Sequence, residues 1–171
     1  NISLLADAKN TSPDKLTVCI LERSRHEKII SSLKKMNVKL KLISDGDVSG
    51  IIYIVDKNSP VDMYVGIGGG PEGVLAAAAL SCYGGQIQTR LVLDEQESQR
   101  AKKMGIKDLN KKYNLNEIVT GDSIFCATGI TSGDLVSGIE IQGNDFVSET
   151  LVTHKSSGLK KVIKLKQKVK W

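Results

Sequence analysis

Two short stretches of the chain carry charged side chains at spacings that could bind anions, hydroxyl groups or metal ions. Arg23 and Arg25 lie two positions apart at an expected helix start, where guanidinium groups and free backbone N–H groups could hold a phosphate. Asp45 and Asp47 flank Gly46, a pattern suited to accepting hydroxyl groups or supporting a metal. Spacing alone also allows plainer roles: a solvated helix start for the arginines and capping of the next helix for the aspartates.

A third stretch is rich in glycine and lies between an expected strand and an expected helix. The run Gly68-Gly-Gly70-Pro-Glu-Gly73 has the form G-x-G-x-x-G, and Asp94 follows about 20 residues later, as in a dinucleotide-binding fingerprint. Glu72 argues against a dinucleotide, because a carboxylate in the first helical turn competes with a pyrophosphate for the positive end of the helix dipole. It favours a divalent cation that could bridge to a phosphate, although it could also simply interact with the dipole.

The elements expected around these stretches decide whether they meet in space. Apolar runs predict four strands, at Leu16–Leu21, Val38–Ile43, Asp62–Ile67 and Gln86–Leu93. Helical patterns alternate with them, at His26–Met36, Val48–Val55, Pro71–Tyr83 and Glu95–Met104. Repeated β-α-β units predict a mainly parallel sheet with flanking helices. Ligands bind outside the carboxyl ends of such strands, so we expect the three stretches to be neighbours on one edge.

The pattern changes to strands and turns after Ser123. Expected strands lie at Ile124–Ala127, Gly138–Ile141, Phe146–Thr153 and Val162–Val169, and we expect them to form antiparallel additions or an edge. The predicted fold class is therefore α/β, with a mainly parallel sheet, flanking helices and antiparallel C-terminal strands.

The basic charge of the chain is confined to its last residues. Residues 155–171 carry seven lysines and no acid, whereas the rest of the chain has a net charge of −2. In Ile163–Trp171 lysines alternate with other residues, which is typical of a half-buried strand whose outer face is protected by lysine. We interpret 155–171 as a basic edge strand or tail; a phosphate-attracting surface and disorder are the alternatives. A charge confined to this segment does not indicate a nucleic-acid partner.

Composition and length predict one soluble domain over residues 1–171. No apolar stretch is long enough for a membrane span, and no secretory signal is visible, so we expect a cytoplasmic protein without a membrane partner. Cys19, Cys82 and Cys126 lack metal-ligand spacing and are expected to be buried, reduced thiols. His26 and His154 are interpreted as surface or helix-start residues. The first residues read like the end of a helix, which suggests a chain cut from a longer one.

Three long motifs resemble one enzyme family, the class II fructose-1,6-bisphosphatases. They are Leu42-Ile-Ser-Asp-Gly-Asp-Val-Ser-Gly50, Gly66-Ile-Gly-Gly-Gly-Pro-Glu-Gly-Val-Leu-Ala-Ala-Ala-Ala-Leu80 and Phe125-Cys-Ala-Thr-Gly-Ile-Thr-Ser-Gly-Asp-Leu135. A looser similarity extends from about Leu4 to Ser157. The resemblance implies half of a fold related to the lithium-sensitive inositol monophosphatase-like sugar phosphatases.

The same resemblance implies an activity, a cofactor and site residues. It implies metal-dependent hydrolysis of the 1-phosphate of fructose 1,6-bisphosphate in gluconeogenesis, with Mn²⁺ or Mg²⁺; sedoheptulose 1,7-bisphosphate stays open as a second substrate. It makes Glu72 a catalytic metal ligand. The implied substrate contacts are Arg23, Ser24, Arg25, Asp45, Gly46, Asp47 and Gly69.

One departure from the family limits what this chain is expected to do alone. The family's other metal ligands lie in an N-terminal half, in an acidic motif of Asp-Gly-Thr character that has no counterpart here. We therefore expect a C-terminal half that supplies the substrate cradle and one ligand, with the N-terminal half of the same enzyme as partner, inactive alone, and homo-oligomeric when intact. The alternatives are a non-catalytic sugar-phosphate-binding module and an NAD-binding Rossmann-like domain that uses Gly68, Gly70 and Gly73.

Overall fold

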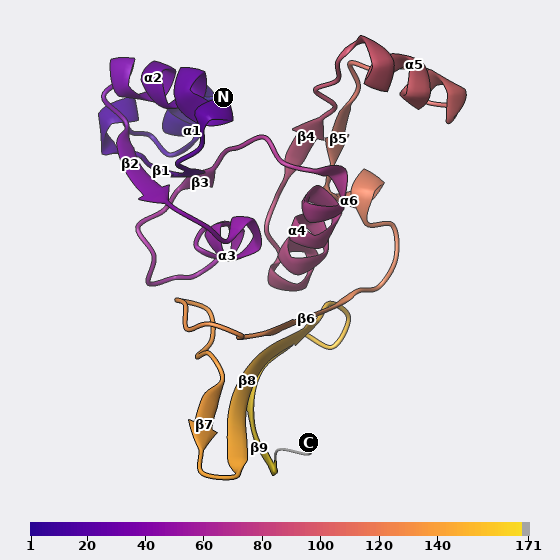
Figure 1. Cartoon of the computed structure of the whole chain (residues 1–171). Coiled ribbons are helices and arrows are strands. Elements are labelled where there is room, and N and C mark those ends of the chain that lie inside the picture. Colours follow the sequence, from indigo (N-terminus) through magenta and orange to yellow (C-terminus); the bar gives the residue numbers. More distant parts are fainter. Residues whose placement is uncertain (169–171) are drawn as a thin grey trace.

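The computed structural model describes residues 1–168, without the side chain of Asp47. It has an open shape (Figure 1), with two larger sheets and a separate two-stranded ribbon. Its helices are α1 (Ile2–Ala8), α2 (Glu27–Lys35), α3 (Asp47–Ile52), α4 (Gly70–Tyr83), α5 (Glu95–Lys103) and α6 (Leu115–Ile118). Two short 3₁₀ turns are η1 (Pro13–Lys15) and η2 (Ser24–His26). The strands are β1 (Thr17–Leu21), β2 (Lys39–Ile43), β3 (Met63–Tyr64), β4 (Gln88–Arg90), β5 (Lys112–Asn114), β6 (Ile124–Thr128), β7 (Glu140–Gln142), β8 (Asp145–His154) and β9 (Leu159–Lys168).

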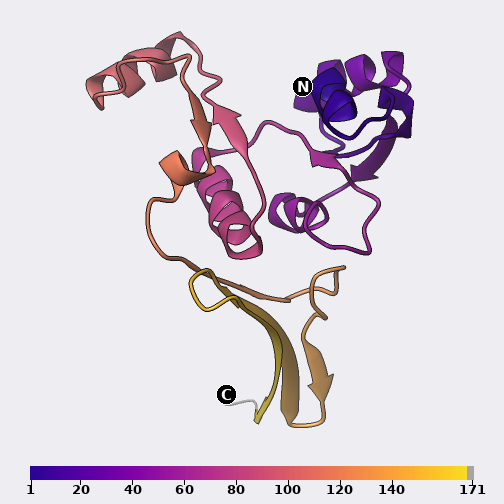
Figure 2. The same cartoon turned by 180° about the vertical axis from the view of Figure 1, so that it is seen from behind.

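The first sheet is parallel and has the strand order β2-β1-β3. Its central strand is apolar and buried from Val18 to Leu21, as expected for a strand covered on both sides. On one face, α1 and α2 pack against Val18 through Ile2, Ala6 and Leu33. On the other face, α3 and α4 form a second cluster that includes Tyr64 of β3 (Figure 2). The predicted parallel sheet with flanking helices is confirmed.

Helix α4 forms the interface between the two sheets. Ala76, Ala77 and Ala79 are buried, and their small side chains allow neighbouring elements to approach closely. The helix starts beside Pro71 and ends at Gly84, which adopts the left-handed φ of 72° that favours glycine at a helix end. Its residues contribute both to the cluster with α3 and to the one with the C-terminal strands.

The fourth expected strand does not join the parallel sheet. It is reduced to β4, which pairs with β5 in an antiparallel ribbon. The reason is chemical: Gln88 and Arg90 are exposed, and a parallel strand inside such a sheet would have to bury both of its faces. Helix α5 then extends from the ribbon and begins with a capping box between Asp94 and Glu97.

The second sheet is antiparallel and is built around β8. Strand β9 pairs with β8 along its whole length, whereas β6 and β7 share the other edge of β8. The inner face, defined as the face toward α4, carries Phe125 and Leu151, which pack with Ala79 and Cys82. Antiparallel strands at the C-terminus are thus confirmed as predicted.

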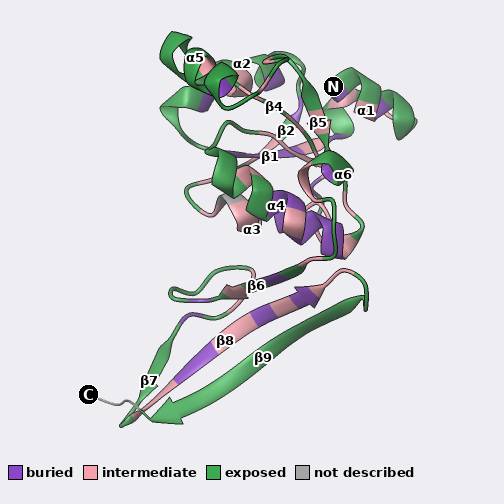
Figure 3. Cartoon of the chain, turned by 90° about the vertical axis from the view of Figure 1, so that its right-hand side faces the viewer, coloured by how far each residue is buried: buried purple, intermediate pink, exposed green. Residues whose placement is uncertain are grey.

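The C-terminal strand is less buried than its sequence pattern indicated. All ten residues of β9 are exposed, so it is not half-buried, and Figure 3 shows this exposure along the whole strand. The reason is that α4 packs mainly on β6 and β8 and meets β9 near its start, where Lys160 Nζ lies 4.4 Å from the centre of the Tyr83 ring. Lysines of β9 pair instead with acids of β8, at Lys164–Glu149 and Lys166–Asp145. Residues 169–171 lie outside the described residues.

A polar cluster holds the β8–β9 turn against the start of β6. The Asp122 carboxylate accepts hydrogen bonds from the Ser156 hydroxyl (2.7 Å) and from the ring of His154 (2.8 Å). These bonds, the one from Ser156 first, hold the pKa of Asp122 well below its usual range. The second nitrogen of His154 lies 2.8 Å from the Ser157 hydroxyl. His154 therefore has a structural role in this turn.

Among residues 1–168, no helix combines the length and the apolar character needed to cross a membrane.

Candidate functional site

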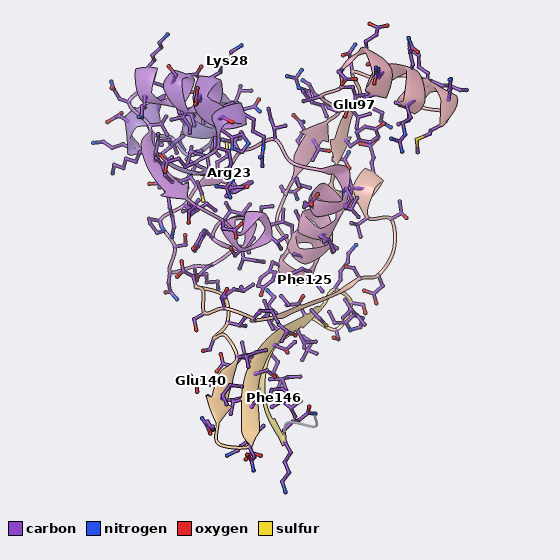
Figure 4. The ribbon with its side chains drawn as sticks, in the orientation of Figure 1. Arg23, Lys28, Glu97, Phe125, Glu140 and Phe146 are labelled. Atoms are coloured by element: carbon purple, nitrogen blue, oxygen red, sulfur yellow. The ribbon has the colours of Figure 1, made fainter. Side chains whose placement is uncertain are left out.

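The parallel sheet brings the three chemically equipped loops to one edge. They follow β1, β2 and β3, and because these strands are adjacent and parallel, their carboxyl ends point the same way. A guanidinium nitrogen of Arg23 lies 3.9 Å from a carboxylate oxygen of Asp45, which joins the first loop to the second. Figure 4 places Arg23 on the side of the N-terminal layer that faces α3. Both partners are exposed, so the pair is weak and both groups remain open to a ligand.

Arg25 joins the first loop to the third. Its Nε donates a 2.6 Å hydrogen bond to the carbonyl of Ile67, within the glycine-rich loop. This bond uses the inner nitrogen of the guanidinium and leaves its terminal nitrogens for other partners. Ser24 lies between the two arginines, exposed, at the start of η2.

His26 holds the first and third loops together, a structural role that the sequence interpretation missed. It is completely buried and is therefore not a surface residue, although it does lie at the start of α2. One ring nitrogen lies 2.8 Å from the carbonyl of Leu21, and the other accepts a 2.8 Å hydrogen bond from the Ile67 N–H. The second nitrogen also lies 3.1 Å from the Ile67 carbonyl, so both of its neighbours belong to the glycine-rich loop. His26 thus ties the end of β1 to the glycine-rich loop, and only its position directly after Arg25 could have suggested this role.

The second loop depends on the absence of a side chain at Gly46. Its φ of 86° is in the left-handed region, and an added Cβ would lie 2.3 Å from the Ser49 hydroxyl oxygen. That hydroxyl donates a 2.8 Å hydrogen bond to the Gly46 carbonyl, and the Asp45 carboxylate accepts one of 2.9 Å from the Gly46 N–H. The side chain of Asp47 lies outside the described residues, so its role stays a prediction.

Glu72 occupies the first turn of α4, where its exposed carboxylate bends back over the glycine-rich loop. A Cβ built at Gly69 would lie 2.3 Å from one oxygen of Glu72. Glycine at position 69 therefore leaves the room that this carboxylate occupies, next to the free N–H groups of the helix start. The arrangement places a negative oxygen beside the edge that carries Arg23 and Arg25.

The donor groups of this edge do not form a metal site by themselves. Among the described residues, no group of three or more His, Cys, Asp or Glu side chains could hold a metal ion. Glu72 is one carboxylate at the right edge, whereas Asp45 faces Arg23. A divalent cation here would need further protein oxygens from outside the described part of the chain.

The strand arrangement argues against the dinucleotide-binding alternative. A fingerprint requires the strand after the glycine-rich helix to return beside the first strand, but β4 pairs with β5 in a separate ribbon. Asp94, the residue at ribose-binding spacing, accepts a 2.8 Å hydrogen bond from the Glu97 N–H as the cap of α5. Its carboxylate is thus already used in local structure.

A hollow of about 450 Å³ lies next to the first loop. It is lined by Glu22, Arg23, Ser24, Glu27, Ile30, Ser31 and Lys34. It shares two of the predicted substrate contacts and none of those on the second and third loops.

The third sequence motif, near Asp134, meets α3 from below the parallel sheet. The Tyr53 hydroxyl donates a hydrogen bond to the Asp134 carboxylate, and Lys41 lies 3.5 Å above the Tyr53 ring. Burial, followed by this hydrogen bond, raises the pKa of Tyr53 to about 12. The contact joins the loop after β6 to the element that follows the second loop. Asp134 lay in a quoted motif, but nothing in the sequence indicated Tyr53 as its partner.

Comparisons with known proteins show what this chain is similar to. A family model described as "Bacterial fructose-1,6-bisphosphatase, glpX-encoded" matches residues 1–167. A protein of Trichodesmium erythraeum is 33% identical over 92% of this chain and 50% of its own length, and a Synechocystis protein gives the same values. A Synechococcus protein is also 33% identical, over 92% of this chain and 49% of its own length. All three are named D-fructose 1,6-bisphosphatase class 2/sedoheptulose 1,7-bisphosphatase, and this chain spans about half of their length.

Proposed function

This chain belongs to the glpX-encoded bacterial fructose-1,6-bisphosphatase family, and from that premise we propose that it forms the substrate-binding half of a sugar bisphosphatase. The observation that carries the proposal is the meeting of three loops at one sheet edge, with Arg23 and Arg25 beside the glycine-rich start of α4. Guanidinium groups and free helix N–H groups are the donors that proteins use for phosphate. Relatives named for fructose 1,6- and sedoheptulose 1,7-bisphosphate support these two substrates.

Each loop has a distinct part in the proposed site. Arg23, Ser24 and Arg25 bind the phosphate that is not cleaved, because their donors lie together on the first loop. Asp45 and Asp47 accept hydrogen bonds from the sugar hydroxyls, and Gly46 and Gly69 let the ligand approach the backbone closely. The reaction is the hydrolysis of a phosphate monoester. An oxygen of water forms a new bond to the 1-phosphorus, the bond to the sugar oxygen breaks, and that oxygen takes up a proton.

Membership in a bisphosphatase family implies a requirement for a divalent metal, and we propose Mn²⁺ or Mg²⁺. Such an ion, when bound, offsets charge that develops on the phosphoryl oxygens. Glu72 is the ligand that this chain supplies. Since the described residues offer no set of three donors, the remaining ligands come from the half that the longer relatives contain and this chain does not match.

We propose in addition that the 171 residues are the C-terminal half and bind a sugar phosphate weakly without turnover, so that activity requires the N-terminal half. We further propose that the intact enzyme is a cytoplasmic homo-oligomer of gluconeogenesis, as the resemblance to the family implies.

A second function, a non-catalytic sugar-phosphate-binding module, is favoured by one observation. The cradle of Arg23, Arg25 and the α4 start is present in the described residues, whereas a metal cluster is not. The two functions differ in what happens when a complementary half is added.

The test is a recombination experiment. This chain is purified, and the half of the Synechocystis relative that it does not match is produced separately. Release of phosphate from fructose 1,6-bisphosphate is measured with excess Mn²⁺ for each half alone and for the mixture. Activity in the mixture alone is the expected result. Activity of this chain by itself would show that Glu72 is not dependent on partner ligands, and inactivity of a mixture that does bind substrate would favour the non-catalytic module.

A further inference from the structure

The face of the C-terminal sheet that points away from α4 is apolar and uncovered. We call it the outer face. It is formed by Ile124, Cys126, Ile141, Phe146, Val152, Leu159, Ile163 and Leu165, which alternate with the residues of the inner face in the strand register. Ile141 is 70% exposed and Ile124 66%, and Cys126 is also exposed, contrary to the expectation that all three cysteines are buried.

The inner face of the same sheet differs from the outer face, because it is either buried against α4 or charged. Near α4 it is packed, with Phe125 and Leu151 buried. Away from α4 it becomes charged, with the ion pairs Glu149–Lys164 and Asp145–Lys166. In Figure 4, Phe125 of the inner face lies beneath the helices, whereas Phe146 of the outer face lies far from them.

Among residues 1–168, no lysine–carboxylate ion pair forms on the outer face, where the polar contact is the one between His154 and Asp122 (2.8 Å) beside the β8–β9 turn. In the strand register, His154 of β8 pairs with Leu159 of β9 on one side and with Ile124 of β6 on the other. Between Leu159 and Ile163, Lys161 is the residue of β9 whose side chain belongs to the outer face. Apolar side chains from four strands thus gather on this face, together with the polar residues that the register also places there: Thr128, Ser148, Thr150, His154, Lys161 and Gln167. Clustered apolar side chains of this kind are ones that proteins bury in permanent contacts, such as those within a core. A transient partner would normally meet a more polar face.

We propose that the outer face packs permanently against the half of the enzyme that the longer relatives have and this chain does not match. Those relatives contain about as much chain again, which is enough length for a layer that would cover a four-stranded sheet. The inference rests on the proposed function, since it names the surface through which the two halves of that enzyme assemble. A second copy of this chain would also cover apolar residues, and it is the competing outcome in the test.

Two neighbouring residues of β9 provide a matched pair for that test. Ile163 lies on the outer face and is 43% exposed, whereas Val162 lies on the inner face and is 49% exposed. Both are on the same exposed edge strand, so a lysine at either position should leave folding intact. Ile163→Lys places a charge in the proposed contact, and Val162→Lys places the same charge on the opposite side.

The experiment measures binding of each full 171-residue variant to the complementary half of the Synechocystis relative, with Leu165→Lys as a second outer-face variant and circular dichroism as the fold check. We expect outer-face lysines to weaken binding about tenfold or more and Val162→Lys to change it less than about twofold. If the halves restore activity but all three variants bind alike, the outer face is not the contact and the proposed function stands. If wild-type halves neither bind nor show activity, the proposed function itself fails. If this chain instead forms a dimer that does not bind the other half, and the outer-face variants dissociate that dimer, a second copy of this chain covers the outer face.

Discussion

The parallel sheet and the C-terminal sheet both carry apolar side chains on their faces, but the rest of the chain covers them unequally. The parallel sheet has α1 and α2 on one face and α3, with α4 packed beside it, on the other, and its central strand is buried from Val18 to Leu21. The C-terminal sheet has α4 at one end of its inner face and nothing from the described chain on its outer face. The first region therefore contains a complete layered core that holds its loops in place. The second region has apolar side chains on its outer face, but no layer of the described chain covers them.

The loops of the first region should also carry the activity, and the largest expected effect tests that. Glu72→Gln should abolish phosphate release by the recombined enzyme, because it removes a charged oxygen from the proposed metal site without changing the shape of the side chain. Glu140→Gln, an exposed change in β7 of the second region, should leave the rate unchanged. Rates are measured across a Mn²⁺ titration, with circular dichroism to confirm folding. Near-normal turnover of Glu72→Gln at low metal would end the ligand assignment.

The difference in coverage predicts very different costs for the same substitution. Ile20→Ala in buried β1 should lower the free energy of unfolding by about 2–5 kcal/mol, since it leaves a cavity in a close-packed core. Ile163→Ala in exposed β9 should change it by no more than about 0.5 kcal/mol in this chain alone. Urea unfolding followed by circular dichroism gives both values. Equal costs would mean that the second sheet is buried in solution, by self-association or otherwise.

The two histidines allow a finer comparison, because both rings use both nitrogens. His26→Phe should cost about 1–3 kcal/mol, since it keeps the ring but leaves the Leu21 carbonyl and the Ile67 N–H without their buried partner. His154→Phe should cost less than about 1 kcal/mol, because its partners Asp122 and Ser157 are exposed to water. Thermal unfolding of both variants is the measurement. A larger loss for His154→Phe would show that the turn cluster, and not the loop clamp, limits stability.

The smallest expected effect concerns the contact that links the two regions. The raised pKa of Tyr53, about 12 in the folded chain, means that the folded state keeps the phenol proton after the unfolded chain has lost it near pH 10. This contribution is complete below pH 10 and disappears as the pH rises to about 12. The melting temperature should therefore fall more steeply over that interval in wild type than in Tyr53→Phe. Tyr113→Phe, in the β4–β5 ribbon, is the control, and identical slopes for all three proteins would rule out a link through Asp134.

Local pattern in the sequence determined the elements and the edge that carries the site. Apolar runs of strand length, alternating with helical periodicity, were enough to place β1, β2 and β3 and the helices between them, because each of these elements buries a face whose period the sequence repeats. Parallel order then follows from the β-α-β rhythm, and with it the meeting of the loops that contain Arg23, Asp45 and Glu72. Pro71 and the glycines marked the start of α4 for equally local reasons.

Tertiary structure decided what local pattern could not express. The alternation of apolar and lysine residues in β9 is the same whether its apolar side is buried or exposed. Burial depends on α4 and on further chain of the kind that the longer relatives contain. The fourth expected strand had a strand-like sequence, but because its side chains are polar it pairs antiparallel with β5, more than twenty residues away, and not with the parallel sheet. His26 and Tyr53 acquired their roles from backbone and side-chain groups distant in sequence, at Ile67 and Asp134. Contacts of this kind arise only when separate elements pack together, and so they are fixed by the folded chain as a whole.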